Sequence, residues 1–339
     1  MLYGILAATS ALLLAAVLAA LLRLPALRLG IVDRRSRRPV PLSGGVAVVA
    51  ATCLVAVVGD WREVTPLGPD VGRLLVAGGA VALLGFVADV RRVKARFLVG
   101  GTAVAAACVV PYQETGVPAG LLAAGWIVFV TLGFKSLDHA DGLAGTVGVV
   151  TAFGAGACAV AEVMDGLAVL LSVLAAALTG FLMHNWHPAR VGLGACGALF
   201  TGFVPASAAV TTRAGQELGS GAGVLFALTA VVAADVALVV LARRLSGRPL
   251  LRAAPDHLAH RLRRLGLTAQ GVIVLLGLGA FGGVLVGVLV HLGWIAGTGV
   301  LWVGGGALIV VLGLLRLKPQ QPQRVASPQV TSQLRVRNG

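Results

Sequence analysis

Long runs of apolar residues alternate with short polar breaks along almost the whole chain. A helix needs about 20 consecutive apolar residues to cross the hydrocarbon core of a membrane. Eleven windows approach or exceed that requirement: 2–22, 43–60, 71–88, 97–111, 119–135, 142–163, 166–183, 192–212, 219–242, 268–290 and 294–316. The pattern therefore predicts an all-α, polytopic membrane bundle of about 10–11 transmembrane helices.

The composition excludes an ordinary soluble protein. Of the 339 residues, 58% are hydrophobic and only 12% are charged, whereas soluble domains carry about 25% charged residues. We expect a single membrane domain over residues 1–317. Residues 318–339 are rich in Gln, Pro and Ser, and they predict a disordered cytoplasmic tail. The N-terminal run has no basic start before its apolar part, so we expect it to stay as the first helix.

The positive charges fall almost entirely on one set of connections between the predicted helices. Of the 27 Lys and Arg residues, 24 lie in these connections or in the tail, and the opposite connections hold only Arg62, Arg73 and Arg213. Because positively charged loops stay in the cytoplasm, we expect a multi-pass plasma-membrane protein whose C-terminus is cytoplasmic. Topology, with attraction to anionic lipids and phosphorylated substrates, accounts for the net charge of +14. No nucleic-acid partner is expected.

Side chains that can carry chemistry collect at the predicted cytoplasmic ends of the helices. They are His139, His184, His187, His257, His260, Asp33, Asp89, Asp138, Asp141 and Asp256. Asp235 lies inside an apolar window, where an acid is a candidate functional residue, with packing against a basic residue as the alternative. Carboxylates bind Mg²⁺, while Arg and His hold phosphate oxygens. The set is therefore suited to phosphoryl transfer at a membrane surface.

Five cytoplasmic segments carry short motifs in a fixed order. The first loop has Gly30, Asp33, Arg37, Pro39, Pro41, Gly44 and Gly45. The third window ends on Gly85 and Asp89, and the next motif contains Asp138, Asp141, Gly142 and Gly145. The longest motif contains Asn185, Pro188, Ala189, Arg190, Gly194, Gly197, Phe200 and Gly202. The last contains Asp256, His257, His260, Arg261 and Gly266, and it follows Asp235 with its adjoining basic loop.

These motifs resemble those of the polyprenyl-phosphate N-acetylhexosamine-1-phosphate transferases, the glycosyltransferase family 4 that includes the peptidoglycan lipid I synthase. The resemblance implies transfer of an amino-sugar-1-phosphate from a UDP-sugar to a polyprenyl phosphate, with release of UMP, in cell-wall or envelope-polymer biogenesis. It also implies the following roles: catalytic Asp89, His257 and His260; nucleotide- or substrate-binding Asp141, Asn185, Asp235 and Arg261; and Mg²⁺-binding Asp138 and Asp141.

Three alanines stand where the family pattern has acids: Ala88, Ala144 and Ala195. A methyl group can neither ligate Mg²⁺ nor take a proton, so two interpretations stay open. The protein is an enzyme in which Asp138 and Asp141, one helical turn apart, share the metal. Alternatively, it is a catalytically silent paralogue that binds a lipid phosphate or acts as a partner subunit in envelope assembly. A transporter is a third hypothesis, based only on helix number and Asp235, and a homodimer is also left open.

Overall fold

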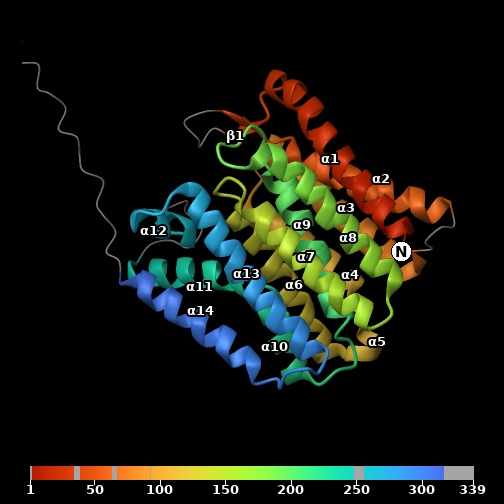
Figure 1. Ribbon diagram of the computed structural model, residues 1–339, viewed down its shortest axis with the longest axis vertical. Coiled ribbons are helices and arrows are strands. Elements are labelled where there is room, and N and C mark those ends of the chain that lie inside the picture. Colours follow the sequence, from red (N-terminus) through yellow and green to blue (C-terminus); the bar gives the residue numbers. More distant parts are fainter. Residues whose placement is uncertain (1, 34–38, 63–66, 92, 248–255, 317–339) are drawn as a thin grey trace, which may run out of the picture.

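The computed structural model describes residues 2–33, 39–62, 67–91, 93–247 and 256–316 (Figure 1). Its helices are α1 (Leu2–Arg28), α2 (Gly44–Trp61), α3 (Gly68–Val90), α4 (Ala95–Val109), α5 (Tyr112–Thr115), α6 (Val117–Leu137), α7 (Leu143–Ala161), α8 (Asp165–Asn185), α9 (Gly194–Thr211), α10 (Leu218–Leu228), α11 (Ala230–Leu245), α12 (Leu258–Arg264), α13 (Ala269–His291) and α14 (Gly299–Leu315). The predicted helical membrane bundle is confirmed. The predicted disordered tail and the motif residue Arg37 lie outside the described residues.

Eight of the described helices are long and apolar enough to cross a membrane: α1, α2, α3, α6, α7, α8, α9 and α13. The shorter apolar helices α4 and α14 correspond to two further predicted windows. The remaining window, 219–242, is not one straight span. It forms α10 and α11, which meet at Thr229 with a bend of 85°. The prediction of a single helix there was wrong because hydropathy reports the length of an apolar run and not its direction.

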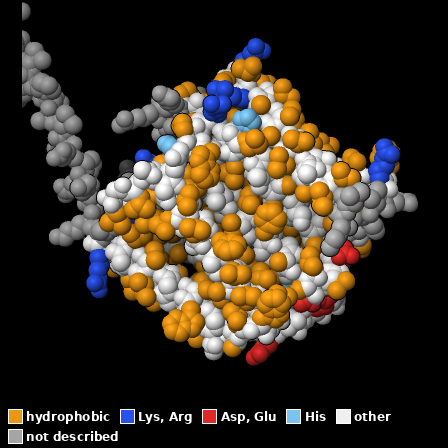
Figure 2. Space-filling view, in the orientation of Figure 1, with side chains coloured by type: hydrophobic (Ala, Val, Ile, Leu, Met, Phe, Trp, Pro, Cys, Tyr) orange, Lys and Arg blue, Asp and Glu red, His pale blue; other side chains and the backbone are white. Residues whose placement is uncertain are grey.

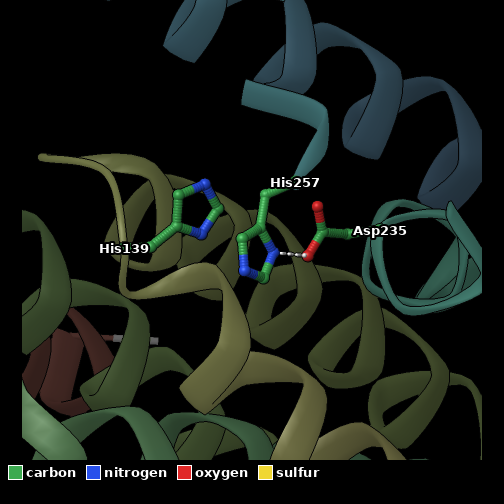
Figure 3. Close-up of side chains that lie close together, drawn as sticks. All are labelled: His139, Asp235 and His257. Atoms are coloured by element: carbon green, nitrogen blue, oxygen red, sulfur yellow. Dashed lines mark hydrogen bonds and ion pairs between the residues drawn. The ribbon is translucent and has the colours of Figure 1, made fainter. Parts of the chain in front are cut away.

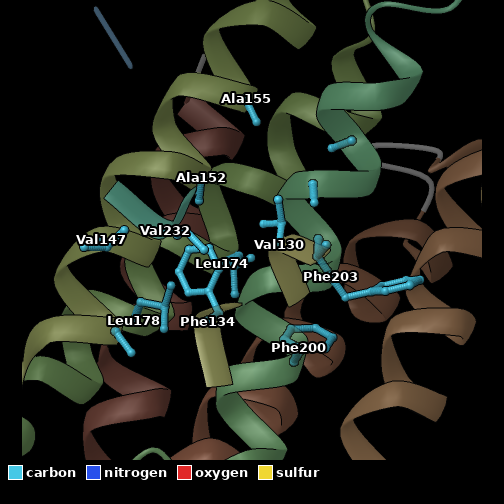
Figure 4. Packing of buried hydrophobic residues seen from close by; sticks show 14 of the residues in the cluster. Val130, Phe134, Val147, Ala152, Ala155, Leu174, Leu178, Phe200, Phe203 and Val232 are labelled. Carbon is cyan, nitrogen blue, oxygen red and sulfur yellow. The ribbon is translucent and has the colours of Figure 1, made fainter. Parts of the chain in front are cut away.

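The centre of the bundle is α9, which is surrounded by α2, α3, α6 and α7 (Figure 1). About 94% of its spanning window is buried inside the protein. Phe200 and Phe203 project from α9 and are fully buried, as is Phe134 of α6 (Figure 4). A helix that is apolar on all sides is stable only when protein or lipid surrounds it. Here protein surrounds it, so α9 is the axis on which the other helices are placed.

Glycines allow two helices to approach the N-terminal end of α9 closely. A Cβ atom at Gly197 of α9 would lie 2.5 Å from the Cα atom of Gly45 in α2. A Cβ atom at Gly85 of α3 would lie 2.5 Å from the carbonyl oxygen of Ala195. Small residues at helix crossings permit such backbone contact in membrane proteins. The ends of α2 and α3 are therefore fixed against the start of α9.

The first helix, α1, packs along α8 and α2. The buried face of α1 is a row of alanines at four-residue intervals, Ala7, Ala11, Ala15 and Ala19, none more than 5% exposed. On α8, a side chain at Gly180 would collide with the carbonyl oxygen of Leu12. This contact joins helices that are far apart in the sequence.

A short antiparallel pairing, which the all-α prediction did not include, shapes the loop between α1 and α2. Strand β1 (Val32–Asp33) pairs with β2 (Val40–Pro41), with Val32 opposite Pro41. The backbone then bonds to the loop that precedes α9, because the Gly192 N–H donates to the Pro41 oxygen at 2.8 Å and the Gly44 N–H donates to the Gly192 oxygen at 3.0 Å. The first loop is thereby attached to the start of α9.

The surface matches the charge pattern of the sequence. Figure 2 shows hydrophobic side chains across the middle of one face, basic side chains at its top, near the end of α1, and at its left and right edges, and acidic side chains at its lower right. The long apolar helices run between the end of the bundle with the uppermost basic side chains and the end with the acidic ones. The cytoplasmic location of the end of α1 stays a prediction, which labelling can test.

We expect Ser246→Cys to be inaccessible and Arg62→Cys to be accessible to a membrane-impermeant maleimide in intact cells. Both positions are exposed, and the positive-inside rule places them on opposite sides. Each variant is made in a Cys108→Ser background, since Cys108 is the exposed native cysteine among the described residues. Permeabilised cells should label both sites. Labelling of Ser246→Cys but not Arg62→Cys in intact cells would reverse the topology.

We expect Gly45→Ala to destabilise the protein by about 1–3 kcal/mol, the usual cost of overpacking a tight contact. The added Cβ would meet the backbone of Leu193 and Gly197, which cannot move aside as a flexible side chain could. Gly79→Ala is the matched control, because a Cβ there has no neighbour within 4 Å. Thermal unfolding in detergent measures both, and equal unfolding temperatures for the two variants would contradict the role given to this crossing.

Candidate active site

Two of the predicted acids meet at the start of α9. Asp89, near the end of α3, accepts hydrogen bonds from the backbone N–H groups of Ala195, at 2.8 Å, and Cys196, at 3.0 Å. Asp138, directly after α6, lies close enough to the backbone N–H of Gly194 for this group to favour its charged form. The first N–H groups of a helix have no partner within it, and the helix dipole favours negative charge there. The end of α9 therefore holds both carboxylates.

The acids around this helix end form one anionic group. Burial raises the pKa of Asp138 well above its usual range, and the nearby charges of Asp89, Asp33 and Asp141 raise it further. A divalent cation would relieve this repulsion, and Mg²⁺ prefers oxygen ligands of this kind. The donor set thus fits a Mg²⁺ ion. Asp138 and Asp141 do not share a helical face as predicted, because both lie in the turn between α6 and α7.

Asp141 is hydrogen-bonded to the loop that precedes α9. One oxygen of Asp141, Oδ2, accepts from Nδ1 of His187 at 2.8 Å and from the backbone N–H of Ala189 at 3.2 Å. The side chains of Asp141 and His187 are 38% and 39% exposed, so a substrate could reach this pair. The turn after α6 and the loop after α8 therefore meet at an accessible ion pair.

The side chain of Asn185 joins the turn after α6 to the loop after α8. Its Oδ1 accepts from the backbone N–H of Gly142 at 2.8 Å, and its Nδ2 donates to the oxygen of Val191 at 2.8 Å. The side chain is buried, at 5% exposure. Asn185 thus positions the loops around Asp141, and its predicted contact with a nucleotide stays a prediction.

A group of three histidines lies next to the acids. The rings of His139 and His257 are stacked, with centroids 4.0 Å apart, and the ring of His260 is 4.8 Å from that of His139. His257 Nδ1 lies 2.9 Å from Oδ2 of Asp235, and Oδ1 of Asp235 accepts from the backbone N–H of Leu258 at 2.8 Å (Figure 3). The bend after α10 turns α11 so that Asp235 reaches the start of α12.

His139 and His260 bind protons less tightly than free imidazoles do. Burial, together with the charge of His257, lowers the pKa of His139 from 6.5 to about 4. Burial and the charges of His257, Arg263 and Arg264 also lower the pKa of His260. At neutral pH His139 is therefore an uncharged imidazole, which can accept a hydrogen bond or bind a cation.

The structure does not bring Arg261 into this group. Its guanidinium is 4% exposed and donates from Nη1 to the carbonyl oxygen of Leu314 at 2.6 Å, at the end of α14. Its side chain is directed to α14 instead, because α12 packs against that helix. Asp256 is likewise occupied, because it forms a buried ion pair with Arg243 at 3.6 Å.

The three alanines that replace family acids lie at this end of the bundle. Ala88 precedes Asp89 at the end of α3, Ala144 is at the start of α7, and Ala195 is the second residue of α9. Ala144 and Ala195 are buried, at 2% and 8% exposure. These three residues thus lie around the site, but none of them supplies a carboxylate.

Two residues of the site had no assigned role in the sequence analysis. His139 was counted among the histidines at helix ends, and His187 likewise. The only signal for them was their position inside the motifs of Asp138 and Asn185. Their contacts depend on how three separate loops fold together, which the motifs do not specify.

Comparison with known proteins agrees with this arrangement. The profile of glycosyl transferase family 4 matches residues 72–213. A Streptomyces coelicolor protein with the provisional name of a glycosyltransferase is 65% identical over 328 residues, covering 96% of this chain and 80% of that protein. The decaprenyl-phosphate N-acetylglucosaminephosphotransferase of Mycolicibacterium smegmatis is 28% identical, covering 72% of this chain and 71% of that one. The phospho-N-acetylmuramoyl-pentapeptide-transferase of Moorella thermoacetica is 32% identical, covering 65% and 67%. This chain belongs to glycosyl transferase family 4, the membrane glycosyltransferases that include the polyprenyl-phosphate sugar-phosphate transferases.

Proposed function

We propose that this protein transfers an amino-sugar-1-phosphate from a UDP-sugar to a polyprenyl phosphate at the cytoplasmic surface of the plasma membrane. The observation that carries the proposal is the gathering of Asp89, Asp138 and Asp141 around the start of α9 in a chain of this family. Relatives whose names specify decaprenyl phosphate and N-acetylglucosamine phosphate support the same class of substrates.

Phosphoryl transfer depends mainly on positioning and on neutralising charge. Asp138 and Asp141 would hold Mg²⁺, which when bound neutralises a diphosphate. Each oxygen of Asp89 keeps a lone pair after its bond to α9, so this carboxylate can still act next to the attacking lipid phosphate. The half-buried His257 and His260 can donate to phosphate oxygens near the start of α12.

A second candidate is a catalytically silent member that binds the lipid phosphate or a partner subunit. The absence of carboxylates at Ala88, Ala144 and Ala195 favours it. So do the two α9 bonds of Asp89, because they give that acid a structural role that persists without catalysis. Activity measurements on designed variants separate the two candidates.

We expect the natural protein to show only weak Mg²⁺-dependent transfer, or none if the silent candidate is right, and we expect Ala195→Asp alone not to restore full activity. The positions act as one site, in which effects are strongly non-additive. The triple variant Ala88→Asp, Ala144→Asp, Ala195→Asp should be the most active of the three. The measurement is the release of UMP from a UDP-amino-sugar in the presence of polyprenyl phosphate and purified, detergent-solubilised protein.

Two results would contradict this expectation. Strong Mg²⁺-dependent turnover by the natural protein, abolished by Asp138→Asn or Asp141→Asn, would show that the remaining acids suffice. Failure of the triple variant together with the natural protein, when both bind polyprenyl phosphate, would support the silent member.

We expect Asp138→Asn to stabilise the metal-free protein at pH 8 by a few degrees in unfolding temperature. The folded state raises the pKa of Asp138, so it binds this proton more tightly than the unfolded chain does. Stability is then lost as the pH rises above the ordinary Asp pKa of about 4 towards the raised value. Asn cannot ionise, so the variant should depend less on pH. Exposed Asp165 provides the control, Asp165→Asn. Equal pH profiles for Asp138→Asn and the natural protein would show that folding does not raise the pKa of Asp138.

A further inference from the structure

Three side chains of types that commonly bind metals lie close together, beside but separate from the acids around the start of α9. One ligand atom from each of His139, Asp235 and His257 lies within 4.8 Å of the others (Figure 3). They come from the turn after α6, from α11 and from the residue before α12. The convergence therefore depends on the bend between α10 and α11.

The ring of His139 has a nitrogen lone pair without a partner. Its Nδ1 lies 2.8 Å from the carbonyl oxygen of Ser136. A carbonyl only accepts, so Nδ1 carries the proton and Nε2 of the neutral ring does not. This Nε2 is buried and has no hydrogen-bond partner among the residues that the structure describes. Leaving a buried polar atom unpaired is costly, and a bound cation would remove the cost.

Asp235 supplies the negative charge. Its side chain is completely buried within the apolar helix α11. The backbone N–H of Leu258 holds Oδ1, so the carboxylate is oriented with Oδ2 towards His257. A buried carboxylate at membrane depth requires a positive partner. Either a protonated His257 or a metal ion fills this requirement.

We propose that His139, His257 and Asp235 bind one divalent ion of the zinc class. Two imidazole nitrogens and one carboxylate oxygen are ligands that suit Zn²⁺ and neighbouring transition metals, whereas Mg²⁺ prefers oxygen alone. The site is therefore distinct from the acids around α9. The family resemblance assigns no role to His139, and the site does not rest on the proposed transfer reaction.

Binding requires only a local adjustment. Ligand atoms on one tetrahedral Zn²⁺ are roughly 3.3 Å apart, given metal–nitrogen distances of about 2.0 Å. The present separations reach 4.8 Å, and the two rings are stacked at 23°, so the ring of His139 must turn to direct Nε2 towards the ion. Three protein ligands leave a fourth position for water or a phosphate oxygen. The ion would also join α11, α12 and the turn after α6.

Binding of Co²⁺ tests the proposal, because Co²⁺ in a tetrahedral N/O site has visible absorption bands. Full-length protein in detergent, with any affinity tag removed and metals stripped by a chelator, is titrated with Co²⁺ without nucleotide or lipid substrate. We expect one equivalent to bind, to be displaced by Zn²⁺, and not to be displaced by excess Mg²⁺. His139→Gln and His257→Gln should each weaken binding at least tenfold, and Zn²⁺ should raise the unfolding temperature of the natural protein but not of these two variants.

His184→Gln is the matched control, since His184 lies at the same end of the bundle but outside the group. It should bind Co²⁺ like the natural protein. The proposal is overturned if the folded natural protein binds no Co²⁺ saturably, if both His139→Gln and His257→Gln bind it normally, or if His184→Gln loses it equally. Because no transfer reaction is measured, these outcomes are independent of whether the protein is an active transferase.

Discussion

The free backbone N–H groups at the start of α9 are the constraint from which the rest of the site follows. This helix lies at the centre of the bundle, so water does not surround it, and unpaired N–H groups in such a setting cost several kcal/mol each. Asp89 and Asp138 meet this requirement from α3 and from the end of α6. The glycine crossings at Gly45 and Gly85 allow α2 and α3 to lie against the start of α9, close enough for these hydrogen bonds to form. The carboxylates to which we assign the proposed chemistry thus also have a role in the fold.

The sequence could predict the helices because their lengths and apolar character are local properties. It could also predict that the acids and histidines gather at one end, since the motifs occur in order at helix ends. It could not predict the bend at Thr229, which changes the direction of an unbroken apolar run. It grouped Arg261 with the site through its motif, whereas the partner of this side chain is the oxygen of Leu314 in α14. The bend at Thr229 and the partner of Arg261 both depend on contacts between segments that are far apart in the sequence.

The division between retained and lost motif residues has a physical meaning. Gly85, Asn185, Gly194 and Gly197 belong to contacts that hold backbones together at the start of α9 or around it. The acids missing at Ala88, Ala144 and Ala195 have no comparable duty in packing, and alanine fills the two buried positions. A chain can therefore keep the family fold, and much of the family resemblance, while its ion-binding capacity changes. In this chain the imidazole rings of His139, His257 and His260 lie beside a reduced set of acids.

The packing of α1 against α8 has a consequence for how the protein is made. The alanine row of α1 leaves the ribosome before α8, and the α8 surface that covers it ends only at Asn185. At about 5–20 residues per second, synthesis of the roughly 165 residues from Ala19 to Asn185 takes on the order of 8–33 s. During that interval lipid or an insertion chaperone must cover the part of the alanine row that α8 covers later, and α8 has to enter the membrane beside a helix that is already there. Helix α1 is therefore inserted well before it can reach its final contacts with α8.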